Sequence, residues 1–260
     1  MCKVLNISRK TYYKYRNTID KDYQSYLEIK EVFEEGYETY GYRRIKKALE
    51  LKTGIIMNHK KILRIMKKYD LKVKYIRVFR RKPMTYSVKE NVKPNLLNKN
   101  FKAEKCNQKW STDITFLQHK NKTAYLSCII DLYTKKIISY KISYKATNSL
   151  VTGTLNEAIK KCLNPQGIII HSDQGYQYTS YEYKRICESN GILISMSRKA
   201  TPEDNAPIES FFANLKRETL YSYDIKSLKH YINIVKNWIE FYNTNRVSLN
   251  HSRGYKLCVY

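Results

Sequence analysis

Apolar residues recur at helical spacing in the first quarter of the chain. In residues 40–52, Ile45, Ala48 and Leu49 share one helical face. Residues 58–69 repeat this pattern with Ile62, Ile65, Met66 and Tyr69. The earlier stretch 4–15 is typical of the tail of a helix-turn-helix, with a turn at 6–8 before a basic helix. Residues 1–71 are therefore predicted to form a small, all-helical region.

The helical period ends after residue 71. Residues 72–105 contain Pro83 and Pro94, and they carry 11 basic side chains against only Glu90 and Glu104. Prolines interrupt regular structure, and a run of cations attracts phosphates. We predict a basic linker that lies along a DNA backbone.

The pattern then becomes that of an α/β domain. Apolar runs at 110–118, 123–131 and 136–143 are close enough along the chain to pair as antiparallel strands. A helix is expected at 148–163, with Val151, Leu155, Ala158 and Cys162 facing inward.

The second half of this domain predicts a parallel crossover. A buried strand at 167–173 is followed by a helix at 179–190 and a strand at 191–196. Two helices, at 207–218 and 227–243, complete the pattern. We expect the α/β domain to span 106–250 and a tail to occupy 251–260.

The charge balance predicts a polyanionic partner. The chain has 49 Lys and Arg against 23 Asp and Glu, a net charge of +26. Residues 1–105 hold 28 basic and 11 acidic side chains (+17), and residues 106–260 hold 21 and 12 (+9). Such an excess favours nucleic acid. We therefore expect the N-terminal part to supply the main grip on DNA.

Other classes are disfavoured by what the sequence lacks. The six cysteines show no C-x-x-C spacing, which argues against a zinc knuckle or a disulfide framework and predicts reduced thiols. No apolar run approaches the roughly 18 residues that a membrane span needs. We expect a cytoplasmic, DNA-associated protein with no membrane partner.

Three carboxylates stand at positions suited to metal chemistry. Asp113 lies within the first strand (WSTDITF), Asp173 just after the buried strand (HSDQGYQYTS), and Glu209 on a helix (DNAPIESFFANLK). Phosphodiester cleavage by two metal ions needs several carboxylate ligands, because hard cations prefer oxygen. Taken singly, each acid has a simpler explanation: an exposed strand residue, a turn acid, and a first-turn glutamate favoured by the helix dipole.

Seven ordered motifs resemble the DDE transposases of the insertion-sequence-three family, over roughly residues 35–246. They are YGYRRIKKAL (40–49), NHKKILRIM (58–66), WSTDITF (110–116), YLSCIIDLYTKKI (125–137), HSDQGYQYTS (171–180), SMSRKATPEDNAPIESFFANLKRE (195–218) and FYNTNR (241–246). The resemblance implies a ribonuclease H-like integrase core, a mixed sheet flanked by helices, preceded by the small helical DNA-binding region.

The resemblance also implies an activity and its ligands. Asp113, Asp173 and Glu209 fall in the family's catalytic positions, which implies a triad holding two Mg²⁺ ions, with Mn²⁺ as a substitute. The implied reaction is metal-dependent strand cleavage and strand transfer at the ends of an insertion sequence. The implied partners are double-stranded DNA, further copies of the chain, and the product of an upstream reading frame, since this chain resembles a second-frame product.

Several residues are candidates for DNA contact. Lys216 lies seven residues after Glu209, and because seven helical residues make nearly two turns, both share a face; a solvated surface lysine is the alternative. The other candidates are Asn205, Tyr176, Arg43, Arg44, Lys60, Arg80 and Arg81. We leave Asp131 out, as a hairpin residue, and interpret His171 as a hydrogen-bonded neighbour of Asp173.

Competing functions stay open to different degrees. A tyrosine recombinase is disfavoured because no histidine begins an H-x-x-R element, and a retroviral-type integrase because paired His and Cys are lacking. The stronger alternative is a catalytically inactive or truncated transposase remnant that only binds DNA. It is favoured by the segment NRVSLNHSRGYKLCVY, which lacks the proline usual in the family.

Overall fold

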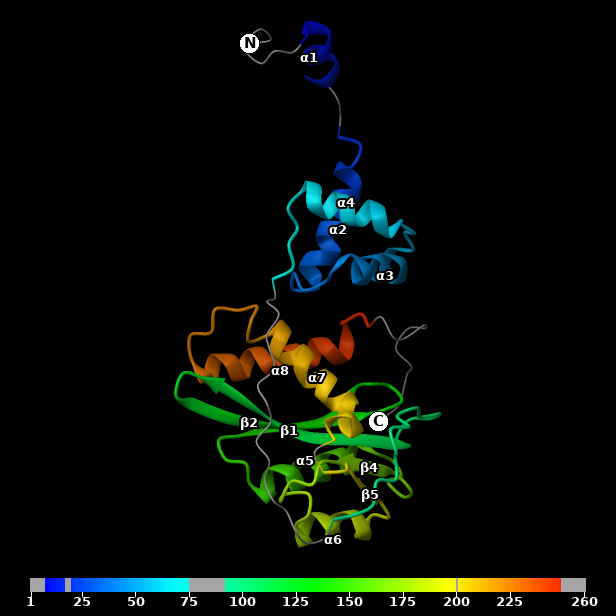
Figure 1. Ribbon diagram of the computed structural model, residues 1–260, viewed down its shortest axis with the longest axis vertical. Coiled ribbons are helices and arrows are strands. Elements are labelled where there is room, and N and C mark those ends of the chain that lie inside the picture. Colours follow the sequence, from blue (N-terminus) through cyan, green and yellow to red (C-terminus); the bar gives the residue numbers. More distant parts are fainter. Residues whose placement is uncertain (1–7, 17–19, 75–91, 200, 249–260) are drawn as a thin grey trace. The chain divides into compact units, whose positions relative to one another are not determined.

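The computed structural model describes residues 8–16, 20–74, 92–199 and 201–248. They form two compact units, which are described separately (Figure 1). The N-terminal unit runs to Val73 and includes Val247, and the core unit runs from Lys74 to Arg246. In the described ranges, no helix is long and apolar enough to span a membrane.

The described part of the N-terminal unit is helical. Its elements are α1 (Arg9–Arg16), α2 (Tyr23–Glu35), α3 (Tyr42–Thr53) and α4 (His59–Lys68). The last three pack on one another around buried Ile29, Ile45, Leu49, Ile62 and Ile65. Gly54 ends α3 in a left-handed conformation (φ 70°), and the Asn58 side chain caps α4 by accepting the Lys60 N–H at 2.8 Å.

These helices confirm two predictions and add one element. The helices expected at 40–52 and 58–69 are α3 and α4, and a basic helix lies within 4–15, although part of the turn expected at 6–8 falls outside the described residues. Helix α2 was not predicted. Its buried face, Ile29, Val32 and Phe33, has the helical spacing that would have revealed it.

The core unit is built on a five-stranded mixed sheet. Its strands are β1 (Lys109–His119), β2 (Lys122–Asp131), β3 (Ile137–Ser143), β4 (Ile169–Ser172) and β5 (Leu193–Met196). Their order is β3-β2-β1-β4-β5, with the first three antiparallel and with β4 parallel to both β1 and β5. The predicted hairpins and the predicted parallel crossover are both confirmed.

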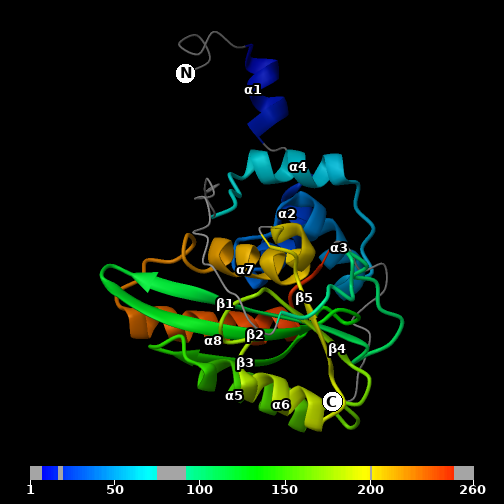
Figure 2. The ribbon, with the colours of Figure 1, turned by 60° about the horizontal axis from the view of Figure 1, so that its bottom comes forward.

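Helices cover both faces of this sheet. They are α5 (Asn148–Lys161), α6 (Tyr181–Ser189), the 3₁₀ turn η1 (Pro202–Asn205), α7 (Ala206–Glu218) and α8 (Leu228–Thr244). Helices α5 and α6 pack together on one face (Figure 2), and α7 and α8 pack on the other (Figure 1). The α5 face buries Trp110, Leu155 and Cys187 among others. Strand β1 is therefore enclosed between two layers of helices.

Helix α7 and the end of α8 are joined by a buried ion pair. The Arg246 guanidinium donates to the Glu218 carboxylate at 2.8 and 2.7 Å, and the Trp238 indole donates to it at 3.1 Å. Both charged side chains are almost fully buried, at 5% and 1% exposed. This contact gives the motif FYNTNR a structural role, because its last residue fixes the helix that carries Glu209.

The second half of the expected linker is part of the core unit. Leu97 is buried, the Leu96 N–H donates to Ser195 Oγ at 2.9 Å, and the Met196 N–H donates to the Pro94 carbonyl at 3.3 Å. Apolar burial and main-chain bonds, rather than the basic side chains, decide the conformation of this segment. In this segment, the basic linker expected over 72–105 therefore packs against the core unit.

The cysteines agree only in part with the expected reduced state. Among the described residues, Cys128, Cys162 and Cys187 are free and buried. Cys106 is disulfide-bonded, which corrects the expectation for that residue. Burial raises the pKa of the Cys128 thiol well above its ordinary value and that of Cys187 to about 12, so these thiols are unreactive.

Candidate active site

The strand register places Asp113 and Asp173 at the same level of the sheet. In the parallel pair β1 and β4, Ser111 is opposite His171. Each acid lies two residues further along its own chain, and side chains two apart point to the same face of a strand. Two carboxylates from distant parts of the sequence are thereby brought side by side, Asp113 within β1 and Asp173 just after the end of β4.

One small pocket contains both carboxylates. Its volume is about 200 Å³, and its lining residues are Asp113, Ile114, Thr115, Phe116, Tyr125, Ala146, Asp173, Gln177 and Tyr178. The Ile114 N–H donates to Asp113 Oδ1 at 2.7 Å, and the Gly175 N–H donates to Asp173 Oδ1 at 2.9 Å. A Cβ on Gly175 would come within 2.9 Å of that same oxygen, so a larger residue there would displace the Asp173 carboxylate.

The pocket holds its acids in an unfavourable environment. The pKa of Asp113 is raised well above its ordinary value, first by burial and then by the negative charges of Asp173 and Glu209. Crowding by protein atoms also raises the pKa of Asp173, although its surface is open to solvent. A bound cation would relieve both the repulsion and the cost of desolvation.

Helix α7 brings a glutamate and a lysine toward this pocket. Glu209 lies in its first turn and acts electrostatically on Asp113. Lys216, two turns later, also acts on Asp113, and its Nζ lies 4.3 Å from the centroid of the Phe116 ring. Burial lowers the pKa of Lys216, and the charge of Asp113 partly opposes that shift. The lysine therefore faces the site instead of projecting into solvent.

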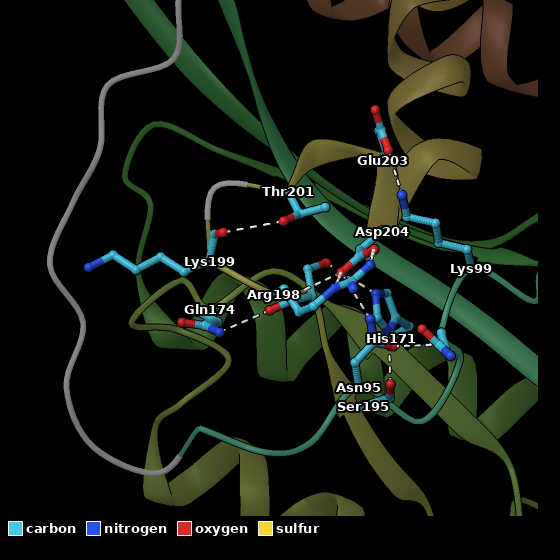
Figure 3. A network of polar contacts seen from close by, with 12 residues as sticks. Asn95, Lys99, His171, Gln174, Ser195, Arg198, Lys199, Thr201, Glu203 and Asp204 are labelled. Atoms are coloured by element: carbon cyan, nitrogen blue, oxygen red, sulfur yellow. Dashed lines mark hydrogen bonds and ion pairs between the residues drawn. The ribbon is translucent and has the colours of Figure 1, made fainter.

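The start of α7 is fixed by a network around Asp204 (Figure 3). Asp204 accepts from the Arg198 backbone N–H at 3.0 Å, from its Nε at 2.9 Å and from its Nη2 at 2.8 Å. Asn95 donates to the same carboxylate at 2.9 Å. These bonds hold η1, and hence the first turn of α7 with Glu209, against the segment around residue 95.

Asn205 has a different position from the one expected of a DNA contact. It is buried, its Oδ1 accepts from Ser111 Oγ at 2.5 Å, and its Nδ2 donates to the Thr112 carbonyl at 3.2 Å. The oxygen and the nitrogen of its side-chain amide are therefore both hydrogen-bonded to β1. This arrangement favours a structural role that holds α7 beside Asp113.

Asp131 has the turn role that the sequence indicated, whereas His171 is hydrogen-bonded to two serines and not to Asp173 as expected. His171 is buried between Ser195 Oγ at 2.8 Å and Ser197 Oγ at 3.1 Å, and burial lowers its pKa to about 4. Asp131 is also buried, and it accepts from the Thr134 hydroxyl at 2.8 Å and from the Thr134 N–H at 3.1 Å. It thus supports the turn between β2 and β3, away from the pocket.

The remaining candidates for DNA contact lie at different places. Tyr176 is 57% exposed, and its hydroxyl donates to the carbonyl of Ala146, a residue of the pocket wall. In the N-terminal unit, Arg43 and Lys60 are exposed, and Arg44 stacks on the Tyr40 ring at 5.7 Å. Arg80 and Arg81 lie outside the described residues.

Of the pocket residues that were not singled out from the sequence, Gln177 and Phe116 have side chains suited to contact a ligand. Gln177 is buried and donates to the Ala146 carbonyl at 3.2 Å, and Phe116 is 55% exposed. Gln177 sits in the quoted motif after Asp173, so its proximity was the available signal. For Phe116 the sequence offered no such signal, because its exposure depends on β4 ending at Ser172.

Within the described ranges, no three His, Cys, Asp or Glu side chains are close enough together to hold a metal ion. Asp113 and Asp173 share the pocket, whereas Glu209 is not among its lining residues. The donor set nevertheless fits a hard divalent cation, because its atoms are carboxylate oxygens with raised pKa values.

Comparison with known proteins identifies both units. The family described as Integrase core domain matches residues 103–202 and again 190–251, and the family described as HTH-like domain matches residues 21–81. The chain is 36% identical to the InsK protein of insertion sequence element IS150 from Escherichia coli, over 96% of this chain and 88% of that protein.

Two further relatives also match over most of both chains. The chain is 37% identical to an uncharacterized 31 kDa protein of insertion element IS600 from Shigella sonnei, over 97% of this chain and 93% of that protein. It is 31% identical to the transposase InsF for insertion sequence IS3A from Escherichia coli, over 92% and 85%. With its helix-turn-helix-like unit and its ribonuclease H-like integrase core, the chain belongs to the insertion-sequence-three family of DDE transposases, the enzymes of DNA transposition.

Proposed function

We propose that Asp113, Asp173 and Glu209 form one divalent-metal site at which this transposase cleaves and joins DNA strands at the ends of an insertion sequence. The observation that carries the proposal is the pocket shared by Asp113 and Asp173, toward which α7 presents Glu209 and Lys216. These are three acids and one cation from three separated motifs. Structural carboxylates in the same unit are paired instead, as Asp204 is with Arg198.

Each residue has a separate task at this site. Asp113, Asp173 and Glu209 would hold two Mg²⁺ ions, or Mn²⁺ in their place, through their carboxylate oxygens. Such ions, when bound, polarise the phosphodiester and activate the attacking oxygen. Lys216 binds a phosphate of the DNA beside Asp113, and Gly175 leaves room around the Asp173 carboxylate.

The same site performs two successive displacements. In the first, a water oxygen forms a bond to phosphorus at the end of the element, the P–O bond to the 3′ oxygen breaks, and a 3′-hydroxyl is released. In the second, that hydroxyl oxygen attacks a phosphodiester of the target, and the target's own 3′ oxygen leaves. Both steps develop negative charge on oxygens next to the site, where the Lys216 ammonium stabilises it.

The N-terminal unit supplies most of the grip on DNA. Helix α4 exposes Lys60 and Lys67, whereas its Arg64 and Lys68 are exposed but pair with Asp22 and Asp20. Arg43, Arg44 and the basic residues Arg80 and Arg81 extend this grip along the phosphate backbone. Because binding then releases counterions from the phosphates, we expect the affinity for DNA to fall steeply as salt is added.

The reaction also requires other molecules. Two ends of an element are joined in one event, so we propose that several copies of the chain act together on DNA in the cytoplasm. We further propose that the product of the upstream reading frame assists them. The retained acids and the family match over nearly the whole chain favour an active enzyme over a remnant that only binds DNA.

The test is an assay of nicking and strand transfer on duplexes that carry the ends of the insertion sequence that encodes this chain. We expect nicked and joined products in Mg²⁺ and in Mn²⁺, and none when EDTA removes the metal. Products formed at the same rate in EDTA would contradict the metal site. Binding without products in any divalent cation would favour the remnant.

A further inference from the structure

An exposed aromatic ring stands in the active-site pocket. Phe116 lies three residues after Asp113 on β1, lines the same pocket as Asp113 and Asp173, and is 55% exposed. Singly exposed apolar side chains are common on protein surfaces and need no explanation. What distinguishes this ring is its position beside two carboxylates where a DNA strand must enter.

The sheet leaves this ring open on one side. Strand β1 pairs with β4 only from Lys109 to Ser111, because β4 ends at Ser172. Beyond that point β1 continues with β2 alone, and Phe116 is opposite Tyr125. The early end of β4 thus creates both the space for the carboxylates and the open edge at which Phe116 is exposed.

The ring already has a partner that DNA would compete for. The Lys216 ammonium lies 4.3 Å from the ring centroid, a cation–π distance. A phosphate is a stronger partner for an ammonium than a ring is, because a full negative charge attracts it. When a strand enters, the lysine moves to the phosphate and the ring surface that it covered becomes available.

We infer that Phe116 stacks on a nucleobase next to the scissile phosphate, while Lys216 binds the phosphate itself. The two side chains match the two parts of one nucleotide, and the metal ligands lie beside them. Stacking on an aromatic ring tolerates any base, so Phe116 would position the strand without selecting its sequence. This inference rests on the proposed function, because it takes the pocket to be the site of strand cleavage.

A fluorescent base analogue tests the contact directly. The full chain is bound to an element-end duplex that carries 2-aminopurine at the nucleotide next to the scissile phosphate, in Ca²⁺ to prevent cleavage. Stacking quenches this fluorophore. We expect quenching with the parent and with Phe116→Trp, and bright fluorescence with affinity about tenfold lower for Phe116→Ala. Phe116→Leu, which keeps an apolar side chain, should also fail to quench.

A matched control separates this ring from other exposed aromatics. Tyr144 is 67% exposed and does not line the pocket, so Tyr144→Ala should quench like the parent. Parental quenching and affinity in Phe116→Ala, or equal loss in Tyr144→Ala, would overturn the inference.

A cleavage assay in Mg²⁺ distinguishes this failure from failure of the proposed function. If Phe116→Ala cleaves with parental KM and kcat while Asp113→Asn is inactive, only the stacking role is wrong. If Asp113→Asn cleaves like the parent, the metal site itself is wrong. A raised KM in Phe116→Ala that Phe116→Trp restores supports the contact.

Discussion

Two groups of carboxylates in the core unit have opposite surroundings. Asp204 accepts four hydrogen bonds from Arg198 and Asn95, and these partners hold its pKa well below the ordinary value. Asp113 accepts a hydrogen bond from the Ile114 N–H at 2.7 Å, and burial with nearby negative charges holds its pKa well above the ordinary value. The fold neutralises the first carboxylate and leaves the second for an external cation.

The difference shows how one fold separates stability from function. Glu218 and Arg246 form a second neutralised pair, and together with Asp204 they fix the two ends of α7. The proposed metal ligands Asp113 and Asp173 instead raise the free energy of the metal-free protein, because like charges repel in a desolvated pocket. The paired carboxylates Asp204 and Glu218 therefore help to position the unpaired acids of the proposed metal site.

The largest expected effect is on catalysis. Asp113→Asn removes a proposed metal ligand and changes a net charge of +26 by one unit, so DNA binding should persist. Strand cleavage should fall on the order of 10³-fold or more, because a bound metal contributes several kcal/mol to the transition state. Single-turnover rates and gel-shift affinities measure the two effects. A variant that kept its cleavage rate would refute the assignment.

Breaking the buried pair should affect stability instead. Arg246→Met leaves Glu218 buried without its guanidinium, which we expect to cost about 3–5 kcal/mol in the free energy of unfolding. Urea denaturation measures this loss. The double variant Arg246→Met/Glu218→Leu should recover part of it, since no charge is then left buried. A single variant as stable as the parent would show that the pair is not a structural anchor.

Asp131→Asn is the control for the loss of cleavage in Asp113→Asn and for the loss of stability in Arg246→Met. This carboxylate accepts hydrogen bonds within the β2–β3 turn, so its replacement should cost about 1–2 kcal/mol of stability. The stabilisation that added Mg²⁺ gives should match that of the parent, because Asp131 lies away from the pocket. Thermal melts with and without Mg²⁺ test this, and loss of the metal response without loss of stability would argue against the turn role.

The smallest expected effect is a difference in pH dependence. A carboxylate whose pKa is lowered in the folded state stabilises the fold at pH values above its ordinary pKa of 3.8. This stability is lost as the pH falls below that value, as expected for Asp204. Asp113 has a raised pKa, so its ionisation destabilises the metal-free fold as the pH rises through that raised value. Asp113→Asn should therefore gain stability relative to the parent toward neutral pH. Urea titrations without metal at several pH values measure the gap, and a gap that did not grow with pH would contradict it.

The sequence predicted most of the core unit because its signals are local. The apolar patterns of the strands and of α5, and the motifs around Asp113 and Asp173, can each be read from a short stretch of sequence. The register of β1 and β4 then brings the two acids together. Helix α2 was not predicted, although its buried residues Ile29, Val32 and Phe33 recur at helical spacing.

Other features depend on contacts between distant segments. Nothing near Asn95 in the sequence indicates that it donates to Asp204, and nothing near Asn205 indicates that its amide is used on β1. The basic composition around residue 95 predicted a linker, whereas burial of Leu97 decided its place. The exposure of Phe116 depends on where β4 ends, which is a property of the sheet and not of the motif.

The most direct test of the shared metal site is anomalous diffraction from crystals of the protein with element-end DNA and Mn²⁺. The account predicts manganese density between the carboxylates of Asp113 and Asp173, with Glu209 moved in to contact it and with the Lys216 ammonium at a phosphate. Manganese bound elsewhere, with Asp113 and Asp173 free of metal in the presence of DNA, would contradict it.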